Sequence, residues 1–248
     1  MQPNLCKALV GELLICGLIL GSAKAATVRY RVSVTKESHD SGINDNSEVA
    51  VWLVPLSGKA PQSAALRERG QEPQLEIVQK HKQFHPHLLV LQVGTEVNFP
   101  NKDPFFHNVF SLYDGKRFDL GLYEAGSSRR VLFDRIGICY IFCNIHPQMS
   151  AVVLVVDTPY YAVSNAAGEI DIPDVPPGEY QLHVWNEHAS TRDLKGASRA
   201  VSVEENTSFA GTIRLRESLG LALTHKNKYG RSYDPQVYSD PLYEPQAP

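Results

Sequence analysis

Three potential metal ligands follow one another at intervals of three in the stretch "CNIHPQM" (143–149): Cys143, His146 and Met149. A thiolate, an imidazole and a thioether are all ligands that soft or borderline metals accept. Packing alone gives little reason to place all three in one turn. The sequence therefore leaves two alternatives: the three side chains bind one metal, or the spacing is an accident at the end of an apolar strand.

A fourth candidate ligand, His107, begins the strand-like segment "HNVFSLY" (107–113). His107 lies 36 residues before Cys143. In a Greek-key sandwich, elements separated by this many residues can be neighbours in space. Two imidazoles and a thiolate in a plane, with a weak thioether above, suit copper in both oxidation states. Structural zinc sites usually carry more than one thiolate, and calcium or magnesium prefers oxygen ligands. With no open position, such a site would transfer electrons rather than bind a substrate.

Strand patterns dominate the segments that must position these residues, and Gly, Pro, Asn and Asp separate them. Short strands at this spacing predict an all-β fold with a sandwich or barrel of antiparallel type. One segment, 63–80, predicts a short helix instead. The expected strands are 27–34, 49–56, 87–93, 96–100, 107–113, 129–134, 137–143 and 151–157.

A second, smaller β unit is predicted after Asp157, over residues 158–216, where Gly and Pro-Pro-Gly turns separate short strands. The preceding run 151–156 is apolar at every position, so one of its faces can pack in the first unit and the other on the second. Residues 217–248 are polar, with scattered Tyr, Pro and Asp, and predict a flexible tail.

The first 25 residues are typical of a secretory signal peptide, with a basic start, the apolar run "ALVGELLICGLILG" and small residues at Ala23 and Ala25. The apolar run is shorter than a spanning helix needs, so we expect cleavage and no stable membrane insertion of the mature chain. Removing these residues takes away a net charge of +1, which changes the formal charge from −3 to −4. A mildly acidic chain without a basic block argues against nucleic acid as a partner.

Cys139 and Cys143 are the two cysteines that remain after cleavage. On one strand, residues four apart face the same side and lie roughly 13 Å from each other, which is too far for a disulfide. Cys139 lies inside the alternating pattern "GICYIFC" (137–143), so we interpret it as a buried core thiol.

The segments "FHPHLLVLQVGTEVNFPNKDPFFHNVFS" and "FDRIGICYIFCNIHPQM" together resemble a cupredoxin, the type 1 blue copper fold of plastocyanin and amicyanin. The Cys-x-x-His-x-x-Met loop length is similar to that of amicyanin. The cupredoxin resemblance covers residues 26–157. "GEIDIPDVPPGEYQLHV" resembles the carboxypeptidase regulatory-like, transthyretin-like sandwich, and the whole chain is similar to exported proteins labelled methylamine utilization proteins.

The resemblance implies a Greek-key cupredoxin sandwich followed by a transthyretin-like one, with one copper ion per chain. His107, Cys143, His146 and Met149 would be the metal ligands, and Met149 would be the axial one. Asn108 would tie the two ligand loops together by hydrogen bonds.

One departure from the amicyanin pattern is Ile145, which stands where amicyanin has a proline before the second histidine. Unlike proline, Ile145 supplies a backbone N–H. We hypothesise that this N–H bonds the Cys143 sulfur and raises the reduction potential.

Three other patterns in the sequence lie near these candidate ligands or resemble metal sites. Cys139 with Cys143 is similar to the binuclear purple copper pattern, but there three residues separate the second cysteine from the histidine, and here two do. His85 and His87 flank Pro86 and could form a second metal site. The more economical interpretation is that they are two polar residues on a strand face or in a loop. Phe105 and Phe106 either pack beside the site or belong to the core.

These residues predict an exported blue copper protein, periplasmic or secreted, that is not an enzyme and carries single electrons between unidentified redox proteins. The ring edge of His146, on an exposed loop, would be the electron port. Two rivals remain: a copper-binding or delivery protein without redox turnover, and a non-redox envelope interaction module.

Overall fold

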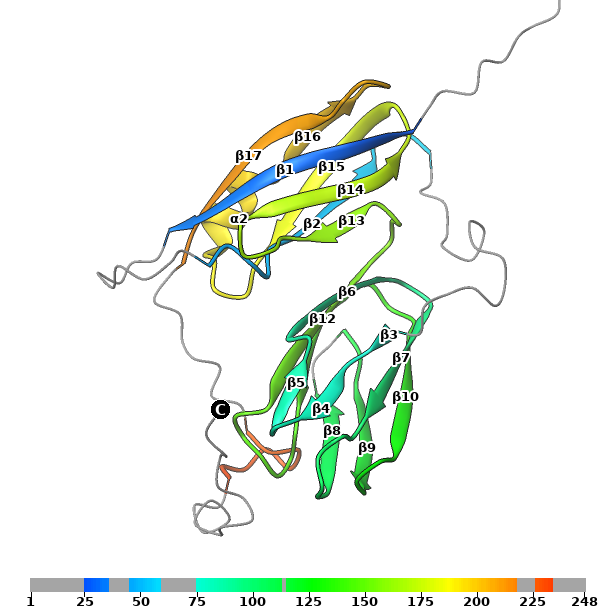
Figure 1. The fold of residues 1–248 in the computed structure, drawn as a ribbon, viewed down its shortest axis with the longest axis vertical. Coiled ribbons are helices and arrows are strands. Elements are labelled where there is room, and N and C mark those ends of the chain that lie inside the picture. Colours follow the sequence, from blue (N-terminus) through cyan, green and yellow to red (C-terminus); the bar gives the residue numbers. More distant parts are fainter. Residues whose placement is uncertain (1–24, 36–44, 59–74, 113–114, 218–225, 234–248) are drawn as a thin grey trace, which may run out of the picture.

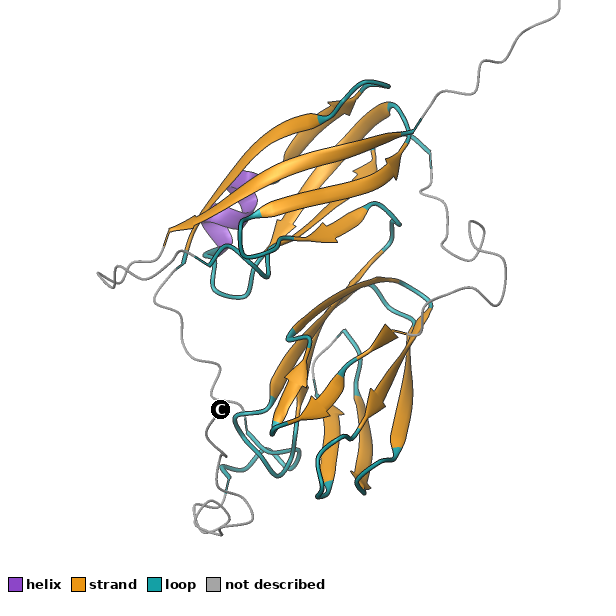
Figure 2. Ribbon diagram, viewed as in Figure 1, coloured by secondary structure: helices purple, strands orange, loops and turns teal. Residues whose placement is uncertain are grey.

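The protein is described here by a computed structural model that covers residues 25–35, 45–58, 75–112, 115–217 and 226–233. Within these ranges the chain is almost entirely β-strand, with one short helix, α2 (Figure 2). The all-β class predicted from the sequence is therefore confirmed. The strands form two units, which we call the inserted domain (75–156) and the flanking domain (26–55 and 161–216) (Figure 1).

The inserted domain is a sandwich of a five-stranded sheet, ordered β6-β12-β11-β8-β9, and a three-stranded sheet, ordered β10-β7-β3, with β4 and β5 forming a separate hairpin. Its strands are β3 (Leu75–Glu76), β4 (Val78–Lys80), β5 (Gln83–His85), β6 (Leu88–Gln92), β7 (Thr95–Pro100), β8 (His107–Ser111), β9 (Phe118–Tyr123), β10 (Ser128–Phe133), β11 (Gly137–Phe142) and β12 (Ser150–Val156).

The core of this sandwich forms where the inward-facing residues of both sheets meet. Phe99 of β7 and Phe133 of β10 are fully buried in one cluster with Ile141 of β11 and Val153 of β12. Because strand residues alternate between faces, every second residue of each strand contributes to this core.

The flanking domain pairs strands from both ends of the chain. One sheet is ordered β14-β1-β17 and the other β13-β2-β15-β16. Its elements are β1 (Ala26–Thr35), β2 (Ala50–Pro55), β13 (Tyr161–Val163), β14 (Glu169–Val175), β15 (Gly178–Trp185), α2 (Thr191–Ala197), β16 (Arg199–Val203) and β17 (Phe209–Arg216).

This pairing differs from the predicted division at residues 157 and 158, which assigned 26–157 to the first unit. β1 pairs with β14 and β17, and β2 pairs with β13 and β15, so both strands belong to the second unit. The two units therefore do not simply follow one another. The alternation of β1 shows that one face is buried, but it carries no information about which distant strand is the partner.

β12 is buried on both faces, as its unbroken apolar run predicted. Val153 packs in the core of the inserted domain, whereas Val152 and Leu154 pack in a cluster with Trp52 and Trp185 of the flanking domain. The second face of β12 thus forms the contact between the two domains.

All eight predicted strands are present, and within the inserted domain the structure adds β3, β4, β5 and β9. The predicted helix 63–80 is wrong for its described part, since residues 75–80 form β3 and β4, and its remainder lies outside the described residues. α2 was not predicted, although Ser190 caps it by accepting from the Asp193 N–H, a pattern that the sequence contains.

The predicted signal peptide lies outside the described residues, apart from Ala25. None of the helices in the described ranges is long and apolar enough to cross a membrane. Of the predicted tail, 218–225 and 234–248 also lie outside them, whereas residues 226–233 are described and contact the inserted domain.

Candidate metal centre

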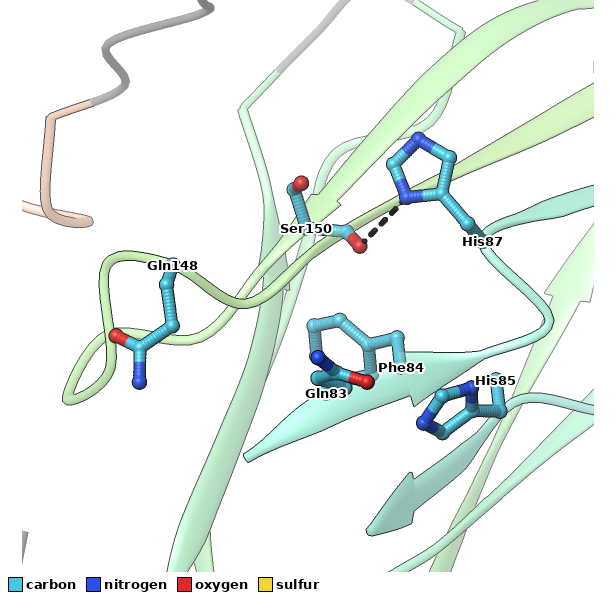
Figure 3. A pocket seen from close by; sticks show the side chains of 6 residues that line it. All are labelled: Gln83, Phe84, His85, His87, Gln148 and Ser150. Atoms are coloured by element: carbon cyan, nitrogen blue, oxygen red, sulfur yellow. Dashed lines mark hydrogen bonds between the residues drawn. The ribbon is translucent and has the colours of Figure 1, made fainter. Parts of the chain in front are cut away.

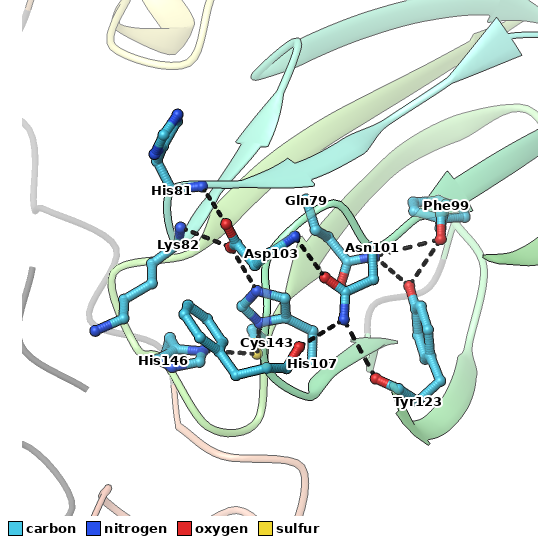
Figure 4. A network of polar contacts seen from close by, with 11 residues as sticks. Gln79, His81, Lys82, Phe99, Asn101, Asp103, His107, Tyr123, Cys143 and His146 are labelled. Carbon is cyan, nitrogen blue, oxygen red and sulfur yellow. Dashed lines mark hydrogen bonds and ion pairs between the residues drawn. The ribbon is translucent and has the colours of Figure 1, made fainter. Parts of the chain in front are cut away.

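Three of the four predicted ligands converge at one end of the inserted domain. His107 is the first residue of β8, and Cys143 and His146 lie in the loop between β11 and β12 (Figure 4). Cys143 Sγ lies 3.8 Å from His107 Nδ1 and 3.7 Å from His146 Nδ1. In the described part of the chain, these three residues form the group whose donor atoms all lie within 4.8 Å of one another.

The sheet register explains this convergence. β11 runs antiparallel to β8, with Phe142 opposite Phe110, so the chain that continues beyond Phe142 runs toward His107 at the beginning of β8. The loop then folds back on itself, because the Met149 N–H donates to the His146 carbonyl at 3.0 Å and the Cys143 N–H donates to the Met149 carbonyl at 3.3 Å.

Asp103 orients the first imidazole. His107 Nε2 lies 2.8 Å from Asp103 Oδ2, and the backbone N–H groups of His81 and Lys82 donate to the same carboxylate at 2.6 and 3.0 Å (Figure 4). Burial raises the pKa of Asp103, but these hydrogen bonds outweigh it and leave the pKa lowered. An ionised Asp103 holds the ring proton on Nε2, and this leaves Nδ1 of His107 free of a proton and facing Cys143.

Sequence reasoning missed Asp103. Its signal was its position four residues before His107, in a loop where Asn101 accepts the Asp103 N–H through Oδ1 at 3.0 Å. A carboxylate near a candidate ligand histidine is the expected orienting partner.

Cys143 is fully buried, and burial is the largest influence on its thiol, raising the pKa. Hydrogen bonds from the backbone N–H groups of Asn108, Ile145 and His146 act in the opposite direction, because they stabilise the thiolate. The Ile145 N–H thus bonds the sulfur, as hypothesised. Its effect on a reduction potential stays a prediction.

His146 is only 2% exposed, so the expectation of an exposed ring edge is wrong. Burial, with smaller contributions from His107 and Lys82, lowers its pKa to about 4. Phe105 explains part of this burial, since its ring centroid lies 5.6 Å from that of His146 and 5.2 Å from that of His107. Phe105 therefore packs beside the site, whereas Phe106 is 55% exposed.

Met149 lies on the same loop and is fully buried, in the core cluster that also contains Cys143. This burial agrees with a thioether facing inward, and its role as fourth ligand stays a prediction. Asn108 differs from expectation: its side chain donates to Asp119 Oδ1 at 2.7 Å and to the Gly121 carbonyl at 3.0 Å. That side chain ties β8 to β9, and only the backbone N–H of Asn108 reaches Cys143.

Cys139 is a free, fully buried thiol, as interpreted from the sequence. Its sulfur lies 3.3 Å from Ser111 Oγ and 3.3 Å from the Lys116 carbonyl. Both are oxygen acceptors for the S–H, and Cys139 is not part of the His107 group.

His85 and His87 line a shallow pocket of about 270 Å³ with Phe84, Gln148 and other residues (Figure 3). Both ring nitrogens of His87 face oxygens: Nδ1 lies 3.1 Å from the Ser150 carbonyl, and Nε2 lies 2.6 Å from Glu187 of the flanking domain. A ring engaged at both nitrogens has no lone pair for a metal. This supports the interpretation without a metal.

The donor set fits a copper ion. Protein metal sites have bonds of about 2.3 Å to sulfur and about 2.0 Å to nitrogen, so a planar three-ligand arrangement needs sulfur–nitrogen separations of roughly 3.7 Å. The two sulfur–nitrogen distances of 3.8 and 3.7 Å match this value. The lowered pKa values of His107 and His146 keep both imidazoles neutral near pH 7, the state in which they bind metals.

Comparison with known proteins gives similar structures but no sequence family. No protein-family model matches the chain, and no curated protein matches it either. A purple cupredoxin from Nitrosopumilus maritimus is 24% identical to this chain, with a TM-score of 0.31. The match covers 34% of this chain and the whole of that protein. An amicyanin variant in the Cu(I) state is 17% identical to this chain, with a TM-score of 0.32. The match covers 43% of this chain and 98% of that protein.

A copper-containing nitrite reductase from Thermus scotoductus is 25% identical at a TM-score of 0.35. The match covers 40% of this chain and only 28% of that enzyme. The structural neighbours are thus cupredoxins matched over a minor part of this chain.

Proposed function

We propose that this protein is a cupredoxin-type copper protein that carries single electrons through one mononuclear type 1 centre. The observation that carries the proposal is the convergence of His107, Cys143 and His146, with all their donor atoms within 4.8 Å. Bound copper would supply the one-electron redox couple. His107, Cys143 and His146 would hold it, with Met149 as the axial ligand.

The surrounding residues have separate tasks in this proposal. Asp103 fixes the His107 ring through Nε2, so that Nδ1 faces the sulfur. The three backbone N–H groups at Cys143 stabilise the thiolate form. Phe105 packs against both imidazoles and limits the access of water. Fixed ligands change little in position when the charge on the metal changes, and this favours electron transfer.

Burial favours electron transfer over copper delivery. His107 and Cys143 are fully buried and His146 is 2% exposed, so a recipient protein has no exposed ligand to attack. A delivery protein exchanges its metal through accessible ligands. A non-redox envelope module would need neither the converging donors nor the orienting carboxylate.

The remaining parts of the proposal are location, partners and the absence of catalysis. We propose an exported, periplasmic or secreted protein that exchanges electrons with redox proteins as donor and acceptor, and that catalyses no reaction itself. The predicted signal peptide supports the exported location.

A copper titration of the purified metal-free protein tests the proposal. We expect an intense visible thiolate-to-copper band that saturates at one copper per chain, and a reversible one-electron wave in voltammetry. Cys143→Ser removes the band, whereas Cys139→Ser, which makes the same sulfur-to-oxygen change four residues earlier, in β11, retains it.

Three results would contradict the proposal in different ways. Copper binding without the band excludes a type 1 centre. A band without a reversible wave favours the storage or delivery role. Saturation at two copper ions per chain contradicts a mononuclear site and returns Cys139 to the ligand set.

A further inference from the structure

A C-terminal segment contacts the ligand loop from outside the inserted domain. Tyr233 Oη donates to the Cys143 carbonyl at 2.8 Å, and the Lys228 N–H donates to Asn144 Oδ1 at 2.9 Å. These residues follow β17 of the flanking domain, and Figure 1 shows their segment, 226–233, in orange-red beside the loop that joins β11 to β12. The chain thus returns from the flanking domain to the predicted copper ligands.

The segment has a fixed conformation of its own. Asn227 Oδ1 accepts the N–H groups of Tyr229 and Arg231 at 3.0 Å each. The Asn227 N–H donates to the Arg231 carbonyl at 2.9 Å, and Gly230 takes a φ of 74°, which glycine adopts without strain. This turn presents Lys228 and Tyr233 to the loop from a preformed frame.

The same segment also reaches β9, the strand that pairs with the one carrying His107. Lys228 Nζ lies 2.7 Å from Asp119 Oδ2, and the other oxygen of Asp119 accepts from Asn108 Nδ2 at 2.7 Å. Asn108 is the residue after His107. Lys228 therefore connects the β8–β9 pair, through Asp119, to the loop that holds Cys143, through Asn144.

We propose that residues 226–233 clamp the ligand loop, with Tyr233 and Lys228 as positioning residues for Cys143. Tyr233 holds the carbonyl of Cys143 itself, and Lys228 holds the next side chain. Because the Ile145 and His146 N–H groups that bond the sulfur follow directly, fixing the backbone at 143 and 144 fixes their direction. The clamp therefore sets how firmly the loop keeps its geometry, with or without a metal.

Hydrogen exchange of the full-length, metal-free protein tests the clamp without relying on copper. Tyr233→Phe removes one hydroxyl, and we expect the amides of Cys143 and Met149 to exchange about tenfold faster, as the loss of one hydrogen bond implies. Lys228→Met should act on the same amides, and Lys228→Arg should restore part of the protection by keeping the bond to Asp119.

Tyr180→Phe is the matched control. Tyr180 Oη donates to the Pro176 carbonyl at 2.7 Å in the flanking domain, so the variant removes a bond of the same type far from the ligand loop. We expect no change in the exchange of Cys143 and Met149 amides. Equal exchange of these amides in Tyr233→Phe and wild type, or equal acceleration in both tyrosine variants, overturns the proposal.

A copper readout deepens the test and rests on the proposed function. In the loaded protein, Tyr233→Phe should change the ratio of the visible bands and the copper hyperfine splitting in electron paramagnetic resonance, and Tyr180→Phe should change neither. If the wild type gives no thiolate-to-copper band, the proposed function fails and the exchange experiment still decides the clamp. If the wild type gives the band and Tyr233→Phe leaves both signals unchanged, the clamp fails alone.

Discussion

The surroundings of Cys139 and Cys143 differ, although both thiols belong to the same run of chain and both are fully buried. Burial raises the pKa of both thiols. Cys139 lies among acceptor oxygens, those of Ser111 and Lys116, which suit an S–H group. Cys143 lies at the strand end among imidazole nitrogens and backbone N–H groups, which suit a thiolate and a metal.

The contrast shows that burial alone does not make a metal-binding cysteine. The donors and acceptors around the sulfur decide its chemistry, and these change between the middle of a strand and its end. In the middle, ladder hydrogen bonds engage the backbone N–H groups. At the end, the loop frees them to face the sulfur.

The largest expected effect separates the two cysteines by stability. A ligand that binds only the folded state stabilises it by about 4 kcal/mol when its free concentration is 1,000 times the dissociation constant. We expect copper to raise the free energy of unfolding of wild type and Cys139→Ser by this amount, measured by urea denaturation. Cys143→Ser should gain almost nothing, and an equal gain in both serine variants would remove the contrast.

The carboxylate behind His107 gives the next effect. Asp103→Asn leaves an amide that no longer fixes the ring proton on Nε2, so the metal affinity should fall about 10- to 100-fold. Competition with a chelator measures this loss. Glu96→Gln, in the exposed pair with Arg130, is the control and should bind copper as tightly as wild type. Unchanged affinity in Asp103→Asn would show that Asp103 does not orient the ligand.

The backbone N–H of Ile145, which bonds the sulfur of Cys143 and not that of Cys139, gives the third effect. Ile145→Pro removes one hydrogen bond to the sulfur, and Ile145→Val keeps it. One such bond of about 1 kcal/mol corresponds to roughly 40 mV for a one-electron couple, so the potential of the proline variant should fall by that amount. Voltammetry measures it, and a potential equal to that of Ile145→Val would exclude the role of this N–H.

The smallest effect concerns His87, whose surroundings are the reverse of those of His146. The hydrogen bond to Glu187 raises the pKa of His87 above its ordinary value, against burial, and the charges of Glu187 and Glu48 act in the same direction. The contact between His87 and Glu187 therefore stabilises the folded state fully below about pH 6.5. This stabilisation is lost as the pH rises through the pKa of His87 in the folded state.

We expect Glu187→Gln to lower the free energy of unfolding by about 1 kcal/mol at pH 6 and by clearly less at pH 9. Denaturation curves at both pH values give the difference. Glu204→Gln, at an exposed position, serves as the control. A cost that is equal at both pH values would show that the charge on His87 does not matter.

Much of the site could be predicted from residue types. Cys143, His146 and Met149 share one loop, and local spacing suffices to group them. His107 could be named as a candidate from its strand context, but only the pairing of β8 with β11 brings it to the loop. Asp103 was within reach of sequence reasoning, since it lies four residues before His107.

Long-range contacts were out of reach for a physical reason. A strand pattern reports which face is buried and does not report the partner, so the parallel pairing of β1 with β17 was missed. The buried position of His146 was also missed, because packing by Phe105 decides it. The same applies to the contact of Tyr233 with Cys143, since a polar tail gives no signal of where it docks.

The sequence by itself determined the all-β class, most of the strands and the chemistry of the candidate ligands, because alternation, turn residues and side-chain donors are local properties. Only the tertiary structure decided which strands form which domain, how deeply His146 is buried, and what holds the ligand loop. These depend on contacts between residues far apart in the chain, such as Lys228 with Asp119, and no local pattern encodes them.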